Sequence, residues 1–366
     1  MPPSDAPSVS SSNDAPRIVS LLPSATEIVA ALGLESALVG RSHECDFPEG
    51  VSRLPACTES MVDARAGSKE IHRSVSELLA RSLSVYRVDA ERLRALGPTH
   101  VVTQVQCEVC AVSLSQVADA MADWVGATTP GERVGDRPEL VALDASSLEG
   151  VFEDVRRVGA ALSVSKRAEK LVAAMRSRIR EIGDAATGAP NRPRVAAIEW
   201  LSPLMTAGNW MPELIEIAGG HNLFGEAGRH SPRIEWTDVV AADPDVVLVF
   251  PCGFPLERTA AEAGLLRSLP GWERLRAARA GQVYLCEGNQ YFNRPGPRLV
   301  ETLEILAEVL HPSRFAFGHE GEAWMRLDAA KPAAPSRPVK AKDFSAQRPG
   351  RAPGQPRATG DRKTET

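Results

Sequence analysis

Short apolar runs alternate with amphipathic stretches along most of the chain. Residues 18–22 form an apolar run of strand length, and residues 28–32 then place their apolar side chains on one helical face. Ser24 and Glu27, three residues apart at the start of that helix, match a capping box. A second short strand leads directly into a polar cluster at residues 41–46. The pattern predicts a strand–helix–strand unit with polar side chains after the carboxyl end of a strand, where ligands bind in open α/β sheets.

The same alternation continues through the chain and repeats in its second half. An amphipathic helix is predicted over residues 68–82, and Asp89 is the predicted N-cap of another helix. The stretches LRALGPTHVVT and VVAADPDVVLV both read as a helix, a proline-containing turn and a buried strand. The pattern therefore predicts an α/β protein with two similar lobes, each built on a mostly parallel sheet.

Residues 146–185 have helical periodicity and predict a long helix that connects the lobes. It would span about 50 Å if fully helical, although Gly159, Ser163 and Ser165 indicate a break near its middle. The N-terminal lobe is predicted at residues 17–145 and the C-terminal lobe at 191–315, with the ligand cleft between them. Residues 1–16 and 327–366 are rich in proline and polar residues, and we expect both to be disordered.

Composition narrows the class of protein further. The 366 residues are 43% hydrophobic and carry a net charge of -5, so the chain lacks the basic footprint of a nucleic-acid-binding protein. No apolar run reaches the roughly 18 residues that span a membrane. The N-terminus as written shows neither the basic start nor the apolar core of a secretory signal. We expect a cytoplasmic monomer, with a periplasmic or cell-surface location only if the start site is mis-assigned.

Several stretches resemble cobalamin-binding proteins of the helical-backbone class of substrate-binding proteins, which also handles iron–siderophores and haem. They are SLLPSATEIV, SHECDFP, AERLRALGPTHVV and YFNRPGPRLVETLEILAEVLHP. The resemblance covers about residues 17–312, and implies two α/β lobes joined by one helix with the ligand clamped between them. The implied ligand is cobalamin or a related corrinoid or tetrapyrrole, and the partner in transport-linked members is an ABC permease. The combination of HECDFP, CEVCA, EWLSPL and PCGF resembles a branch that often lacks an export signal.

The resemblance also implies ligand contacts in the loops that follow strands. In chain order these are Pro23, Ser24, His43, Glu44, Gln106, Cys107, Trp200, Trp210, Tyr291 and Arg294. Glu44 replaces an aromatic residue of the family, whereas Arg294 is retained and suits an amide or carboxylate of a ligand. The two tryptophans fit core positions equally well. Glu91 matches one surface carboxylate that docks on a permease, and Asp238 lies beside the second such position.

The cysteines leave a second function open. Cys107 and Cys110 have the spacing at which two thiolates hold one soft metal or form a redox pair, and His43 could add a nitrogen ligand. No second cysteine pair completes a zinc pattern, and small buried thiols explain the same residues. The alternatives are a binding protein that holds a tetrapyrrole without turnover, and a cytoplasmic metal- or thiol-dependent enzyme or metal-handling protein on the same scaffold. The binding-protein hypothesis is supported by most of the chain, whereas the enzyme hypothesis is supported by only a few residues.

Overall fold

The first lobe is built on a sheet of four parallel strands in the order β2-β1-β5-β6. The computed structural model describes residues 15–81, 84–105, 114–122 and 137–329. The strands are β1 (Ile18–Ser20), β2 (Leu38–Arg41), β5 (His100–Gln104) and β6 (Glu139–Leu143). The chain moves from β1 to β2 on one side and returns to β5 on the other. Connections therefore diverge between β1 and β5, the arrangement that opens a crevice at the carboxyl edge of a sheet.

The first lobe also contains helices and a small hairpin. The helices are α1 (Pro23–Ala31), α2 (Ser68–Ala80), α3 (Ala90–Ala95) and α4 (Leu114–Ala122). The hairpin pairs β3 (Thr58–Ser60) with β4 (Tyr86–Val88), and α2 lies in the connection between them. The side chain of Asp89 accepts a hydrogen bond of 2.9 Å from the Arg92 amide, which confirms the predicted N-cap of α3.

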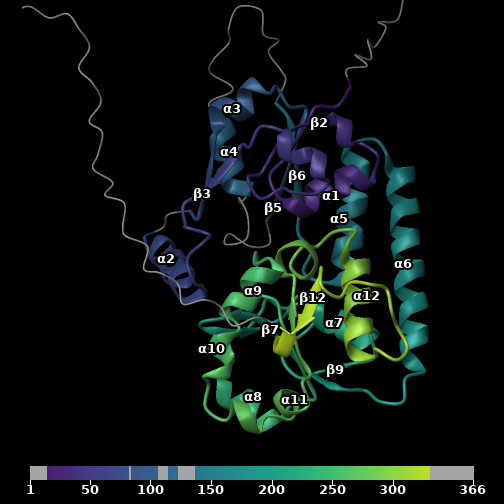
Figure 1. The fold of residues 1–366 in the computed structure, drawn as a ribbon. Coiled ribbons are helices and arrows are strands. Elements are labelled where there is room, and N and C mark those ends of the chain that lie inside the picture. Colours follow the sequence, from purple (N-terminus) through teal and green to yellow (C-terminus); the bar gives the residue numbers. More distant parts are fainter. Residues whose placement is uncertain (1–14, 82–83, 106–113, 123–136, 330–366) are drawn as a thin grey trace, which may run out of the picture. The chain divides into compact units, whose positions relative to one another are not determined.

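Two helices, not one, follow β6. They are α5 (Leu148–Ala161) and α6 (Ser165–Thr187), which pack against each other (Figure 1). Ser163, at φ 57°, lies in the predicted break and lets the chain fold back. Arg167 near the start of α6 donates to the Leu32 carbonyl of the first lobe, and Arg178 farther along pairs with Glu304 of the second. One long helix, α6, thus joins the lobes, and the predicted break near Ser163 separates it from α5, so the stretch does not form one continuous helix of about 50 Å.

The second lobe contains a six-stranded sheet in the order β12-β11-β10-β7-β8, with β9 also paired to β7. Its parallel centre consists of β7 (Arg194–Leu201), β10 (Val246–Val249) and β11 (Val283–Cys286). The remaining strands are β8 (Leu204–Thr206), β9 (His221–Asn222) and β12 (Trp324–Arg326). β8 and β12 are antiparallel to their neighbours. Uninterrupted apolar runs are typical of buried parallel strands, so the sequence predicts only the three central strands of this mixed sheet.

Apolar clusters cover the two faces of this second sheet. Val195 and Ala197 of β7 belong to the cluster that includes α7 (Met211–Ile217) and α12 (Leu299–Leu310). Ala196 and Ile198 point to the other face. The helices there are α8 (Trp236–Ala242), α9 (Leu256–Glu262), α10 (Gly264–Arg267) and α11 (Arg276–Arg279). Burial on both faces accounts for the uninterrupted apolar character of the central strands.

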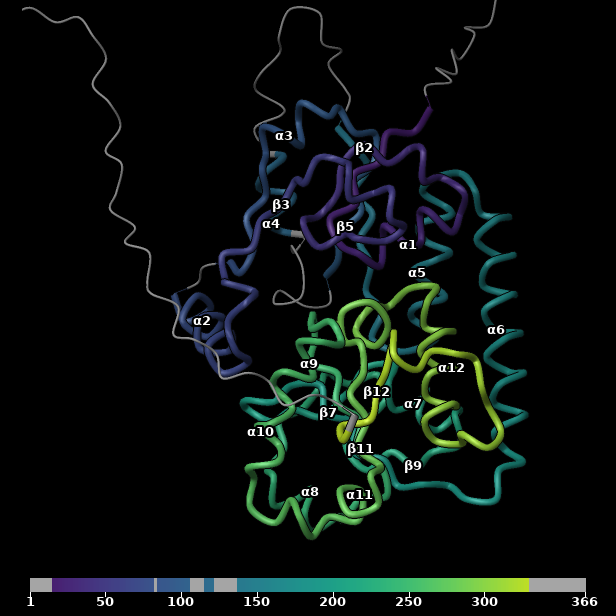
Figure 2. The backbone as a smooth tube through the Cα atoms, in the orientation of Figure 1, coloured from purple at the N-terminus to yellow at the C-terminus, as the bar shows by residue number. Residues whose placement is uncertain are grey.

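One apolar cluster is shared by the two lobes. It contains Ile28 of α1, Val155 of α5, Val172 of α6 and Leu303 of α12, all less than 2% exposed. The backbone trace of Figure 2 shows α6 alongside both α5 and α12, in agreement with their contacts. The lobes are therefore joined through packed helices as well as through the chain. None of the helices in the described ranges has the length and apolar character needed to cross a membrane.

Candidate functional site

Four charged side chains from the two lobes meet, and we call them the arginine cluster: Glu27, Asp46, Arg294 and Arg298. Glu27 lies in α1 and Asp46 follows β2, whereas both arginines lie between β11 and α12. Arg294 Nη1 is 3.0 Å from Glu27 Oε1 and 2.6 Å from Asp46 Oδ1, and Arg298 Nη2 is 2.7 Å from Glu27 Oε1. The cluster places loops from the carboxyl edges of both sheets in contact, the region where the sequence predicts ligand binding.

The arginine cluster is buried and close to electrically neutral. Glu27, Arg294 and Arg298 are each less than a tenth exposed, and Asp46 is 41% exposed. Burial raises the pKa of Asp46, but the hydrogen bonds and charge of Arg294 outweigh it and leave that pKa below its ordinary value. Two carboxylates thus face two guanidinium groups, so each buried charge has a partner.

Glu27 is available to the arginines because the predicted capping box does not form. Helix α1 begins at Pro23, and no side chain caps it. Proline suits the first helical position, and its presence there places Ser24 inside the helix instead of at the N-cap. The Ser24 hydroxyl is buried without a hydrogen-bond partner among the described residues, and the Glu27 carboxylate binds the arginines.

The loop after β11 holds its shape around a buried carboxylate. Glu287 accepts hydrogen bonds from the backbone amides of Asn289 and Gln290 at 2.9 Å and of Leu256 at 2.7 Å. A π-helical turn, Gly288–Phe292, follows. A Cβ at Gly288 would lie 2.2 Å from the Pro251 carbonyl oxygen, so only glycine allows this close approach. The loop thereby presents Asn289, whose amide nitrogen donates to Asp46 at 3.1 Å, and the two arginines.

The loop after β2 holds the His43 ring through its Nδ1 atom. His43 Nδ1 is 2.8 Å from Thr58 Oγ1, and the Thr58 and Ser42 hydroxyl oxygens are hydrogen-bonded at 3.1 Å. In the tautomer that donates from Nδ1 to Thr58, Nε2 keeps its lone pair. Burial, with the charge of Arg41, lowers the pKa of His43, so the imidazole is neutral near pH 7. A neutral ring held through Nδ1 is suited to bind a metal through Nε2.

Glu44 lies beside this imidazole. The Tyr86 hydroxyl donates to Glu44 Oε1 at 3.3 Å, and His43 Nε2 is 4.0 Å from the same oxygen. Burial raises the pKa of Glu44 to about 7. The group is therefore present in both protonation states near neutral pH, and its protonated form can donate a hydrogen bond to a carbonyl oxygen.

The aromatic residues predicted at the site have different environments. Trp200 is half-buried at the end of β7, where it contacts the edge of the Phe254 ring at 5.4 Å. Tyr291 is half-buried, with its ring 5.1 Å from the Arg298 guanidinium. Trp210 is only 5% exposed, and its ring nitrogen donates to the Phe292 carbonyl at 3.1 Å. Trp210 is thus a core residue, whereas Trp200 and Tyr291 keep exposed surface at the strand-end loops.

The structure changes the interpretation of Arg294. The sequence predicts that its guanidinium contacts the ligand, yet it donates to Glu27, Asp46 and Asn289. Sequence reasoning missed Asp46, Asn289 and Arg298 as members of this cluster. The sequence did contain a signal for the cluster: two arginines lie four residues apart in one predicted strand-end loop, and acidic residues lie in the strand-end loops of the other lobe.

The remaining predicted residues divide into those the structure describes and those it does not. Pro23 is half-buried at the start of α1. Glu91 is exposed in the first turn of α3, and Asp238 is exposed but accepts a hydrogen bond from the Glu235 amide at 3.3 Å, which caps α8. The predictions for Gln106, Cys107 and Cys110 lie outside the described residues. Within the described ranges, no three His, Cys, Asp or Glu side chains are grouped to hold a metal ion.

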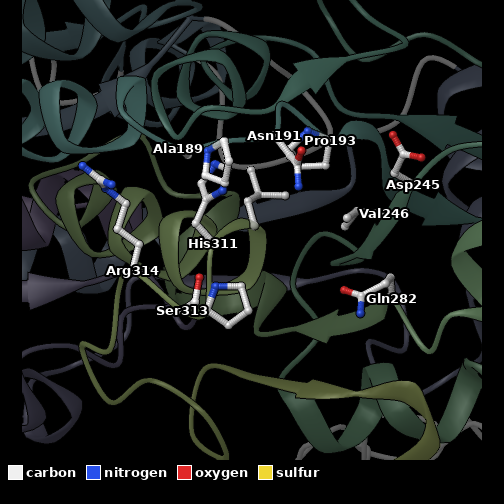
Figure 3. A pocket seen from close by; sticks show the side chains of 12 residues that line it. Ala189, Asn191, Pro193, Asp245, Val246, Gln282, His311, Ser313 and Arg314 are labelled. Atoms are coloured by element: carbon white, nitrogen blue, oxygen red, sulfur yellow. The ribbon is translucent and has the colours of Figure 1, made fainter.

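A pocket of about 470 Å³ lies away from these loops (Figure 3). Its lining includes Pro193, Asp245 and Gln282, which precede β7, β10 and β11. It therefore lies at the amino ends of the strands, opposite the edge where ligands bind in such sheets. Asp245 already pairs with Arg276 at 2.6 Å, and Arg314 donates to the Gly188 carbonyl at 3.2 Å. None of the predicted site residues lines this pocket.

Two α/β lobes joined by a long helix, with the carboxyl edges of their sheets in contact, define a bilobal binding protein. The chain belongs to the periplasmic binding protein family, which matches residues 18–289. An uncharacterized ABC transporter substrate-binding lipoprotein of Bacillus subtilis is 26% identical, over 82% of this chain and 81% of the relative. A cobalamin-binding protein of Halobacterium salinarum is 31% identical over 46% of this chain and 45% of its own length.

Solved structures agree on the fold. A periplasmic haem-binding protein from Roseiflexus aligns with a TM-score of 0.60 and 25% identity, over 82% of this chain and 99% of that one. A periplasmic vitamin B12 binding protein of Vibrio cholerae aligns with a TM-score of 0.55 and 18% identity, over 82% and 98% of the two chains. The cytoplasmic location expected from the sequence is contradicted, because these similar proteins are periplasmic or lipoproteins and point to a location outside the cytoplasm.

Proposed function

We propose that this chain is the substrate-binding protein of an ABC importer, and that its ligand is a corrinoid bound where the strand-end loops of the two lobes meet. Family membership and the names of the relatives support the first part of this proposal. The relatives include both cobalamin- and haem-binding proteins, so the choice of ligand depends on the chemistry of this chain's own residues.

The neutral arginine cluster is the observation that carries the choice of a corrinoid. Haem presents two carboxylates, which need cations when they are removed from water. Among the described residues, Arg294 and Arg298 are the buried cations of this region, and Glu27 and Asp46 already pair with them. Cobalamin instead carries uncharged amides around its ring, and these require only hydrogen bonds. Glu44, which can be protonated near pH 7, supplies such a partner for an amide carbonyl.

His43 is suited to bind the metal of the ligand, whether the ring is a corrin or a haem, and so leaves the choice between them to the arginine cluster. Nδ1 of His43 is held by Thr58, and in the tautomer that donates from Nδ1 the neutral imidazole keeps the Nε2 lone pair. In hydroxocobalamin a ligand above the ring can be exchanged for imidazole nitrogen, which changes the visible absorption of the corrin. The proposal therefore assigns His43 as an axial ligand of the bound cobalt, and Trp200 and Tyr291 as contacts of the ring edge.

Titration of the purified, reduced protein with hydroxocobalamin and, separately, with haemin tests the ligand. We expect saturable binding of hydroxocobalamin with a shifted corrin spectrum, and weaker binding of haemin. The H43Q variant should bind without the shift, whereas H221Q, which changes a half-exposed histidine away from these loops, should retain it. Tight binding of haemin without binding of hydroxocobalamin would contradict the proposed ligand.

A further inference from the structure

A segment of the first lobe extends onto the second lobe. Residues 61–80 leave the small hairpin after β3, form α2 and return towards β4. We call residues 61–80 the strap. Although the chain enters and leaves the strap within the first lobe, helix α2 contacts β7 of the second. The strap is therefore a second connection between the lobes, separate from α6 and from the arginine cluster.

Arg258 and Glu262 of α9 make the main polar contacts with the strap, and Arg233 Nη2 adds a contact of 3.2 Å to His72 Nε2 of α2. The Arg258 guanidinium donates to the backbone carbonyls of Ala64 and Ala66, and lies 3.6 Å from the centre of the Phe254 ring. Both carboxylate oxygens of Glu262 accept from the Ser68 amide at 3.1 Å, at the start of α2. These contacts join a cation to carbonyls and an anion to a helix N-terminus, both favourable combinations.

The hold is polar and local. Ser68 is the only buried residue of α2, and the apolar side of the helix is half-exposed, with Leu79 at 41%. Met61 at the start of the strap is 53% exposed. Val62 and Val75 of the strap pack against an apolar cluster of the first lobe, so the attachment of the strap to the second lobe is what depends on a few hydrogen bonds. Loss of Arg258 or Glu262 should therefore release the strap without unfolding either lobe.

The strap lies at the edge of the second sheet where the ligand is proposed to bind. Phe254, under the Arg258 guanidinium, belongs to the loop after β10, and its ring contacts Trp200 at the end of β7. The strap thus contacts β7 and α9, next to Trp200 and Phe254 at this edge of the sheet. A cover held at this position limits the width available to a ligand.

We infer that the strap forms a detachable wall of the ligand site, and that Arg258 and Glu262 set the size of ligand admitted by holding it closed. This inference rests on the proposed function for its ligand. A loosened wall should favour the bulkier ligand, since hydroxocobalamin carries a nucleotide below its ring whereas haem is flat. Arg258 is in this view a positioning residue and makes no contact with the ligand.

The anchoring is tested without ligand, by hydrogen exchange in the full chain. In the double variant R258M/E262A we expect amides of the strap to exchange about tenfold faster or more, while amides of β1 and α1 keep their rates. R267M is the matched control, because Arg267 donates to the Leu327 carbonyl within the second lobe. Unchanged exchange in the strap of the double variant would overturn the inference.

The role as a wall is tested by association rates of hydroxocobalamin and haemin. In R258M/E262A we expect the rate for hydroxocobalamin relative to that for haemin to rise about fivefold or more, and in R267M to stay as in the unmodified protein. An unchanged ratio together with faster exchange would show a detachable strap that is not a wall. If the unmodified protein binds neither probe, the proposed function and the wall both fail, whereas the exchange result still reports the anchoring.

Discussion

Replacing Glu27 by glutamine should destabilise the protein far more than a surface charge change. Glu27 accepts three hydrogen bonds from charged donors: one from Arg294 at 3.0 Å, and two from Arg298 at 2.7 and 3.1 Å. Each such bond contributes about 1.5–3 kcal/mol, but the three share one carboxylate and do not add. In E27Q the Arg298 guanidinium stays 8% exposed without a carboxylate partner among the described residues. Breaking a buried pair from one side costs about 3–5 kcal/mol.

We expect E27Q to lose about 3 kcal/mol of unfolding free energy, at the lower end of that range, because Asp46 continues to neutralise Arg294. Urea unfolding followed by tryptophan fluorescence measures the loss as a lower midpoint. E181Q is the control, since Glu181 is 69% exposed and pairs with Arg178 at 2.8 Å. That change should cost less than about 0.5 kcal/mol.

A second variant separates the energetic cost of the lost hydrogen bonds from the cost of leaving the Arg298 guanidinium unpaired. E27Q/R298M removes the unpaired guanidinium together with its partner, so it should be more stable than E27Q alone. If E27Q loses less than about 1 kcal/mol, the carboxylate is not acting in a water-free cluster and the reasoning fails. A strong dependence of the E27Q loss on salt would point to the same failure, because buried pairs are little screened.

Three further predictions concern single residues. Because burial raises the pKa of Glu44 from 4.5 to about 7, its carboxyl should destabilise the fold progressively as pH rises through that window. E44Q should gain urea stability over the unmodified protein between about pH 5 and pH 8, and a constant difference would contradict this. W210F should lose about 1 kcal/mol from the bond to the Phe292 carbonyl and keep its affinity for hydroxocobalamin; a large loss of affinity would return Trp210 to the site. Asp154 is 2% exposed and accepts hydrogen bonds from the backbone amides of Asp144 and Ala145. The D154A variant should lose about 1–3 kcal/mol of unfolding free energy, measured as a lower midpoint temperature of thermal unfolding. An unchanged midpoint temperature would show that water replaces the carboxylate.

The lobes and their central strands could be predicted from the sequence because they follow local rules. The strands β1, β5, β7 and β10 are short apolar runs next to proline or glycine, and burial on both faces produces that pattern. The N-cap Asp89 follows an equally local rule, since a side chain needs only to reach an amide three residues away. The edge strands β8, β9 and β12 carry no such signal, because short edge strands depend on tertiary pairing.

The candidate site shows where local reasoning ends. Ser24 and Glu27 satisfy the capping-box spacing, and nothing within that stretch indicates that two arginines from the end of the chain bind Glu27. Arg294 could be interpreted as a ligand contact only while Asp46 was considered separately from it. The tautomer of His43 likewise depends on Thr58 and Ser42, which the fold brings to it.

The arginine cluster also has a consequence for the order in which the chain is made. Arg294 and Arg298 lie 267 and 271 residues after Glu27, so the ribosome completes the first lobe long before their synthesis. During that interval the Glu27 carboxylate lacks both arginine partners and stays hydrated, which opposes final closure of the packing around α1. A chain that terminates before Arg294 keeps this defect permanently. The last loop of the second lobe thus determines when the first helix reaches its final environment.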